Sequence, residues 1–153
     1  MEIITKYVEV HIIRQKKGRL EFLLLKRSEK EIYGGLWQMV TGKIKKGEKA
    51  FESALREMKE ETGLTPKKFW TAPNINSFYD HKEDCFILLP VFAALVNENS
   101  QVKLSEEHTE FKWTGSKNAK ILLAWPGQRK SVEIIENYIL KEPDFLKFVE
   151  IKL

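Results

Sequence analysis

The stretch GKIKKGEKAFESALREMKEETGL, from Gly42 to Leu64, says most about the fold of this chain. A basic loop between two glycines leads into a run with helical spacing, which predicts a helix over residues 49–62. Gly63 is the expected end of this helix, because glycine readily adopts the left-handed backbone of a helix C-terminus, and Pro66 follows soon after. The segment therefore predicts a loop and a helix that belong to one unit.

The predicted helix has an apolar side and an acidic side when residues are placed about 100° apart. The residues that can dock on a sheet are Phe51, Ala54, Leu55, Met58 and Thr62. Glu57 and Glu61 lie one turn apart on a neighbouring stripe, with Glu60 beside them, and such like charges repel one another. A divalent cation would relieve this repulsion, and oxygen ligands favour Mg²⁺ or Mn²⁺ over zinc. A solvated acidic face without a function is the plainer alternative.

Outside this segment, the sequence predicts further strands and one more helix. The expected strands cover residues 4–13, 20–26, 36–41, 69–79, 85–96 and 110–114, and the second helix covers residues 128–140. A turn at Lys17-Gly18 joins the first two strands as a hairpin, and a polar turn at residues 80–84 joins the fourth and fifth. Strands interleaved with helices predict an α/β protein with a mixed sheet and helices on its faces.

Composition narrows the class of protein. The 153 residues suffice for one domain, 1–153, and the net charge of +4 would help to attract an anionic ligand without arguing for nucleic acid. A single cysteine excludes an intrachain disulfide, and Cys85 lies in an apolar run that predicts a buried, inert thiol. Neither a leader nor a run of membrane-spanning length is recognisable, so we expect a cytoplasmic protein without a membrane partner.

The opening segment resembles the Nudix box, whose pattern is G, five residues, E, seven residues, then R-E-U-x-E-E-x-G-U with U aliphatic. Gly42, Glu48 and the run from Arg56 to Leu64 fill every fixed position at that spacing. A match of this length is highly specific. The resemblance covers most of the chain and implies the Nudix fold, an α/β/α sandwich with a mixed β-sheet. It also implies Mg²⁺-dependent hydrolysis, with Mn²⁺ as a possible substitute, of a nucleoside diphosphate linked to another moiety.

The same resemblance assigns roles to residues of the box. It implies that Glu57, Glu60 and Glu61 hold the metal, and that Glu57 is also a candidate base. It implies that Gly42 and the carbonyl of Thr41 shape the metal loop. Many relatives have glycine at the position of Thr41, but only a backbone carbonyl is needed there.

Two further features of the site follow from the resemblance. Glu48 and Arg56 are expected to form an ion pair that orients the helix. Family members often recruit another glutamate from outside the box, and the segment SEEHTEFKW, residues 105–113, makes Glu107 the preferred candidate. Its competitors are Glu106 and Glu110. A solvated loop acid is the alternative for each of them.

Segments outside the box resemble bacterial dATP or dihydroneopterin triphosphate pyrophosphohydrolases. These are GLWQMVTG at residues 35–42, the E-H-x-x-aromatic-K-W stretch of residues 107–113, and LLAWPGQRKSVEII at residues 122–135. The candidate contacts to a planar base are Trp37, Tyr79, Trp125 and Arg129, the last of which could instead touch a phosphate. The candidate contacts to phosphates are Lys26, Arg27 and Lys43. Ordinary packing or surface charge is the alternative for every one of them.

The favoured hypothesis is a pyrophosphohydrolase that converts dATP, another dNTP or dihydroneopterin triphosphate to the monophosphate and pyrophosphate. A diadenosine polyphosphate hydrolase is the nearest rival, since those enzymes are also single small Nudix domains. A catalytically inactive nucleotide sensor or scaffold is the alternative of a different class, but inactive members usually lose the box glutamates that are present here. We expect a small-molecule nucleotide partner, no nucleic acid, and a monomer or homodimer.

Overall fold

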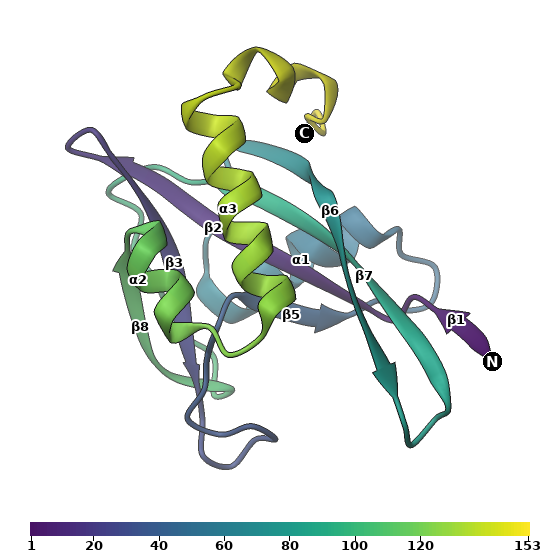
Figure 1. Cartoon of the computed structure of the whole chain (residues 1–153). Coiled ribbons are helices and arrows are strands. Elements are labelled where there is room, and N and C mark those ends of the chain that lie inside the picture. Colours follow the sequence, from purple (N-terminus) through teal and green to yellow (C-terminus); the bar gives the residue numbers. More distant parts are fainter.

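The computed structural model describes residues 1–153 and consists of one mixed sheet with helices on it (Figure 1). Its strands are β1 (Glu2–Ile4), β2 (Tyr7–Lys16), β3 (Arg19–Arg27), β4 (Trp37–Gln38), β5 (Val40–Lys43), β6 (Lys68–Asp80), β7 (Cys85–Leu95) and β8 (His108–Thr114). Its helices are α1 (Ala50–Thr62), α2 (Ser116–Leu122), α3 (Pro126–Leu140) and the short 3₁₀ helix η1 (Pro143–Phe148). No helix combines the length and hydrophobicity that crossing a bilayer requires.

The sheet has eight strands, and its main order is β1-β7-β2-β3-β4. The other strands pair at the sides of this path, β5 with β2, β6 with β7 and β8 with β3. β7 runs parallel to β1 and β2, whereas the other pairs are antiparallel. The mixed α/β architecture predicted from the sequence is therefore confirmed.

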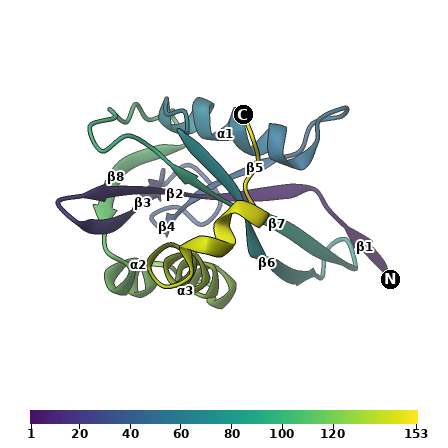
Figure 2. The same ribbon diagram turned by 90° about the horizontal axis from the view of Figure 1, so that it is seen from above.

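Helices cover both faces of this sheet, with α1 on one face and α2 and α3 on the other (Figure 2). Because side chains alternate along a strand, β2 supplies both apolar cores. Val8, Val10 and Ile12 pack in the core that α1 closes. Ile13 packs in the core that α3 closes, together with Val132. Cys85 is free and buried, as expected.

Several element boundaries differ from those expected. The first predicted strand is divided into β1 and β2, and the third into β4 and β5. β8 begins earlier than expected, and α3 begins at Pro126, where proline is suited to the first turn of a helix. The sequence analysis missed α2 and η1, because such short helices show too few turns for a periodic pattern.

Candidate functional site

The ends of α1 are fixed by local interactions. At its start, the carboxylate of Glu52 accepts a hydrogen bond of 2.9 Å from the backbone N–H of Lys49. At its end, Gly63 adopts φ 73° and its N–H donates to the carbonyl of Lys59. Ala54 and Met58 are fully buried against the sheet, so the helix cannot rotate and its acidic side stays at the edge of the core.

Gly42 lies directly against the side chain of Glu57. A Cβ atom at Gly42 would overlap Cγ and Cδ of Glu57 and would lie 2.7 Å from its Oε1. No residue with a side chain fits here unless Glu57 moves. The glycine of β5 therefore sets where the Glu57 carboxylate lies, in agreement with the expected role of this loop.

Arg56 joins the helix to the loop that precedes it. Its Nε donates to both carboxylate oxygens of Glu48, at 2.9 and 3.1 Å, so the expected ion pair is present. Its Nη1 donates to Glu57 at 2.7 Å and to Glu60 at 3.2 Å. Its Nη2 donates to the carbonyl of Lys43 at 2.9 Å. One guanidinium thus orients acidic side chains of the helix and holds the basic loop against them.

Glu61 is the acid that the helix buries. Glu61 is 2% exposed, and neither of its carboxylate oxygens has a hydrogen-bond partner. Burial raises the pKa of Glu61 to about 10, and the adjacent carboxyls of Glu107 and Glu57 raise it further, while Arg27 opposes them. Burial also raises the pKa of Glu57, against the opposing hydrogen bond from Arg56. Carboxyl groups held together in this way fit a divalent cation, which would supply the missing positive charge.

The turn before β8 and the first residue of β8 bring a further acid and a histidine to Glu61. The backbone N–H of Ser28 donates to the carbonyl of Glu107 at 2.9 Å, which ties this turn to the end of β3. One oxygen of Glu61, one of Glu107 and one nitrogen of His108 all lie within 4.8 Å of one another. Among the three candidate acids of this segment, the structure brings Glu107 to the cluster. Glu110 instead pairs with Lys26 at 3.2 Å.

His108 and Gln38 are members of the site that the sequence analysis did not select. The Nε2 atoms of their side chains are 2.9 Å apart. Burial lowers the pKa of His108, so its ring stays neutral near pH 7. Both residues lie inside segments that resemble the triphosphate pyrophosphohydrolases, but neither pattern alone indicates that the two side chains meet.

The predicted phosphate contacts lie on β3 and on the loop before α1. Arg27 ends β3, where its Nε donates to the carbonyl of Ile32 at 2.7 Å and its Nη2 lies 3.6 Å from Glu31. Lys43 is exposed at the end of β5. The charge of Arg27 acts on Glu61, and the backbone carbonyl of Lys43 accepts from Arg56. Contact of either side chain with phosphate stays a prediction.

The predicted base contacts are distributed over two places. Trp37 in β4 forms a bridge with Leu123, just before α3, and Trp125 packs edge-on against Tyr33 with ring centroids 5.7 Å apart. Arg129 of α3 donates to the carbonyls of Leu123 and Ala124 at 2.9 and 3.0 Å, so it braces this loop. Tyr79 lies apart from them on β6, where its hydroxyl donates to Asp84 at 2.7 Å.

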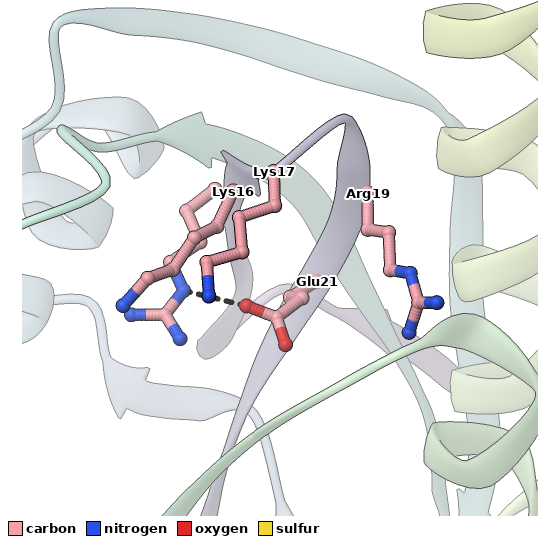
Figure 3. Close-up of a pocket in the computed structure, with 5 residues that line it drawn as sticks. Lys16, Lys17, Arg19 and Glu21 are labelled. Atoms are coloured by element: carbon pink, nitrogen blue, oxygen red, sulfur yellow. Dashed lines mark hydrogen bonds and ion pairs between the residues drawn. The ribbon is translucent and has the colours of Figure 1, made fainter.

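A separate hollow of about 530 Å³ lies at the turn between β2 and β3 (Figure 3). Charged residues alone line it: Arg14, Lys16, Lys17, Arg19 and Glu21. Arg14 donates to Glu21 at 2.8 Å within it, and Arg19 points away from the other side chains (Figure 3). This hollow lies at the opposite end of β3 from Arg27, so it is not part of the acidic cluster.

Comparisons with known proteins identify the family of this chain. The family model described as NUDIX domain matches residues 7–135. The chain is similar to the octanoyltransferase of Myxococcus xanthus, with 29% identity over 133 residues that cover 82% of this chain but only 35% of that longer protein. It is also similar to the asymmetrical bis(5'-nucleosyl)-tetraphosphatase of Caenorhabditis elegans, with 29% identity over 113 residues, 72% of this chain and 79% of that protein.

The fold is likewise similar to solved structures. The MutT protein from Methanosarcina mazei Go1 has 30% sequence identity and a TM-score of 0.72, and the match covers 92% of this chain and 97% of that chain. The sheet, the helices and the loop–helix segment of this chain therefore belong to a known architecture.

Proposed function

Because this chain belongs to the Nudix family, and is a Nudix hydrolase that acts on nucleotide substrates, we propose that it cleaves a nucleoside triphosphate or a closely similar triphosphate. The reaction adds water across a phosphoanhydride bond and releases the monophosphate and pyrophosphate. The preferred substrates are dATP, another dNTP or dihydroneopterin triphosphate. Support for this choice comes from the segments at residues 35–42, 107–113 and 122–135, which resemble enzymes of that specificity.

The observation that carries the proposal is the meeting of four carboxyl groups from two separate segments. Glu57, Glu60 and Glu61 come from α1, and Glu107 comes from the turn before β8. Beyond the effect of burial, the charges of Glu60 and Glu107 act to raise the pKa of Glu57, and those of Glu107 and Glu57 act to raise the pKa of Glu61. We propose that these residues hold the divalent cation, with the carbonyl of Thr41 beside them. A bound Mg²⁺ or Mn²⁺ would neutralise charge on the phosphates and polarise the bond that breaks.

The chain's own residues would orient the reaction around this centre. Arg56, held by Glu48, fixes the carboxylate of Glu57 at 2.7 Å from its Nη1, so Glu57 is preorganised to take a proton from the attacking water. Glu107 is the competing candidate for this base, since it is exposed at the mouth of the cluster. We propose that Arg27, Lys26 and Lys43 contact the phosphates, where positive charge stabilises the charge that develops as the bond breaks.

The nucleoside end of the substrate would lie toward α3. Trp125 is 47% exposed at the start of this helix, and we propose that the exposed part of its ring stacks on the base. Trp37 lies one strand away from the phosphate candidates, because it pairs with Lys26 in the sheet. We retain Arg129 and Tyr79 as weaker proposals, since Arg129 already braces the loop before α3 and Tyr79 lies apart on β6.

A dinucleoside polyphosphate is the second candidate substrate. The similarity to the asymmetrical bis(5'-nucleosyl)-tetraphosphatase of Caenorhabditis elegans favours it, since that relative matches 72% of this chain. The same cluster would then act on a polyphosphate that carries a nucleoside at each end. The two candidates differ in their products, and product analysis therefore separates them.

The test measures products with Mg²⁺ for wild type, Glu57→Gln and the control Glu83→Gln, which changes an exposed acid in the turn between β6 and β7. The panel contains dATP, the other dNTPs, 8-oxo-dGTP, dihydroneopterin triphosphate, diadenosine tetraphosphate and ADP-ribose. We expect monophosphate and pyrophosphate from a triphosphate, with a loss of about 10²–10⁴-fold in Glu57→Gln and no loss in the control. Turnover of the dinucleotide alone would select the second candidate, and no turnover of any compound would refute both.

A further inference from the structure

The imidazole of His108 faces the acidic cluster in a way that the box pattern does not explain. Its side chain is 0% exposed, and Nδ1 lies 3.9 Å from Oε1 of Glu61. That nitrogen has no hydrogen-bond partner. Buried polar atoms are almost always paired. A buried ring nitrogen that faces two unpaired carboxylate oxygens is therefore placed as a ligand would be.

The three donor atoms have separations that suit a shared ion. One carboxylate oxygen of Glu61, one of Glu107 and one ring nitrogen of His108 lie within 4.8 Å of one another. Ligand atoms that are each about 2.1 Å from one cation are about 3 Å apart when adjacent and about 4 Å apart when opposite. Glu107 is exposed, so its side chain is the one of the three that is free to adjust to a bound ion.

Gln38 supplies the outer partner that a metal-binding histidine normally has. Its amide lies 2.9 Å from Nε2 of His108. The amide nitrogen is the atom that faces Nε2 in this structure. Turning the amide over places its oxygen there instead, so that Nε2–H donates to it and Nδ1 keeps its lone pair toward Glu61. The sheet fixes this contact, because β4 and β8 both pair with β3 at its last residues, Leu25 to Arg27.

We propose that Nδ1 of His108, with the carboxylates of Glu61 and Glu107, binds a divalent transition-metal ion such as Mn²⁺ in preference to Mg²⁺. Imidazole nitrogen is a good ligand for first-row transition metals, whereas Mg²⁺ selects oxygen. Glu57 and Glu60 are left as oxygen ligands for a second cation on the phosphates. This inference rests on the metal-binding role proposed for Glu61 and Glu107, but it does not depend on which substrate is cleaved.

Pulsed electron paramagnetic resonance of bound Mn²⁺ tests the inference directly, because a coordinated imidazole produces ¹⁴N modulation of the echo. The samples are wild type, His108→Gln and the control His81→Gln, each with substoichiometric Mn²⁺. His81 is the exposed histidine in the turn between β6 and β7. We expect ¹⁴N modulation in wild type and His81→Gln and none in His108→Gln. The Kd for Mn²⁺ should rise by about 10–100-fold or more in His108→Gln, with a smaller change in the Kd for Mg²⁺.

The wild-type spectrum decides the outcome even if His108→Gln folds poorly. Bound Mn²⁺ without ¹⁴N modulation would overturn the inference, and so would modulation that persists in a folded His108→Gln protein. A third variant, Gln38→Leu, removes the outer partner, and we expect it to weaken Mn²⁺ binding while the modulation remains. Hydrolysis that Glu57→Gln abolishes, combined with an all-oxygen Mn²⁺ spectrum, would keep the proposed function and reject this site. ¹⁴N modulation in a protein that hydrolyses no compound would support this metal site and reject the proposed function.

Discussion

Two regions of this molecule bury ionisable side chains, and burial has different consequences in each. On the face of the sheet that α1 covers, Glu61 shares its surroundings with Glu107, Glu57 and His108. On the opposite face, β2 buries Glu9 alone among carboxylates, with Asn76 as its hydrogen-bond donor at 2.7 Å. Burial raises the pKa of Glu9 to about 6 and that of Glu61 to about 10.

Several carboxyl groups that lie close together raise one another's pKa beyond what burial alone does. The pKa of the lone Glu9 rises less than that of Glu61, because the hydrogen bond from Asn76 stabilises its charged form and no second carboxylate lies beside it. His11, two residues along β2, is also buried, and burial lowers the pKa of its ring to about 3 and keeps it uncharged. One hydrogen-bond donor cannot offset the mutual repulsion of several carboxylates that lie close together. The acidic cluster therefore needs a counter-charge from outside the chain, whereas the buried pair of Glu9 and His11 does not.

Glu61→Gln is expected to have the largest effect, because it removes the buried acid of the cluster. We expect activity to fall by more than about 100-fold, because a ligand of the cation is lost. The stability of the metal-free protein should be unchanged or higher at pH 8, because glutamine needs no proton when buried. Steady-state kinetics and urea unfolding in EDTA measure the two effects. If Glu61→Gln instead lowered both the activity and the stability of the metal-free protein by a large amount, Glu61 would be a residue that stabilises the fold and not a metal ligand.

The next largest effect is expected at His11, on the opposite face of the sheet, and concerns the stability of the protein at low pH. The unfolded chain binds a proton on His11 near pH 6.5, but the folded chain resists it until about pH 3. Stability from this residue is therefore present above pH 6.5 and is lost as pH falls toward 3, by on the order of 3 kcal/mol at pH 4. Urea unfolding between pH 7 and pH 4 gives the free energy of unfolding at each pH. This free energy should fall less steeply with falling pH in His11→Gln than in wild type. Equal slopes would show that another group controls acid unfolding, and His81→Gln should match wild type.

Gly42→Ala tests the geometry of the acidic cluster without removing any acid. The new Cβ must displace the side chain of Glu57. We expect a loss of about 10–100-fold in kcat/KM, the range typical when a supporting contact of a site is disturbed. Gly115→Ala is the matched control, because a Cβ there meets no atom within 4 Å. Unchanged activity in Gly42→Ala would show that the position of Glu57 tolerates movement.

The smallest effect is expected from Glu9→Gln. The folded pKa of Glu9, about 6, exceeds its ordinary value of 4.5, so the unfolded chain loses its proton first as pH rises. The stability that the protonated carboxyl provides is present below pH 4.5 and is lost as pH rises through 6. Glu9→Gln should therefore be more stable than wild type above pH 6, by up to about 2 kcal/mol, with unchanged hydrolytic activity. Lost activity would place Glu9 in the substrate site.

Much of the fold was predictable, because its long elements carry clear periodic patterns. The helix of the box, the β2–β3 hairpin and the antiparallel β6–β7 pair all follow from local spacing and turn residues. The interruptions between β1 and β2 and between β4 and β5 were not predictable, because they depend on which neighbour each strand finds. β1 pairs with β7, whereas the start of β2 pairs with β5.

The acids of the box and the spacing of Gly42 before them can be read from the amino-acid sequence alone. Helical spacing places Glu57, Glu60 and Glu61 along one helix, and the pattern of the box marks Gly42, whose contact with Glu57 only the structure shows. The burial of Glu61, its closeness to Glu107 and His108, and the contact of His108 with Gln38 follow from the tertiary structure alone. The physical reason is that these contacts join segments far apart in the chain, through the pairing of β4 and β8 with β3. Local periodicity carries no information about such pairing, and it cannot tell a solvated glutamate from a buried one.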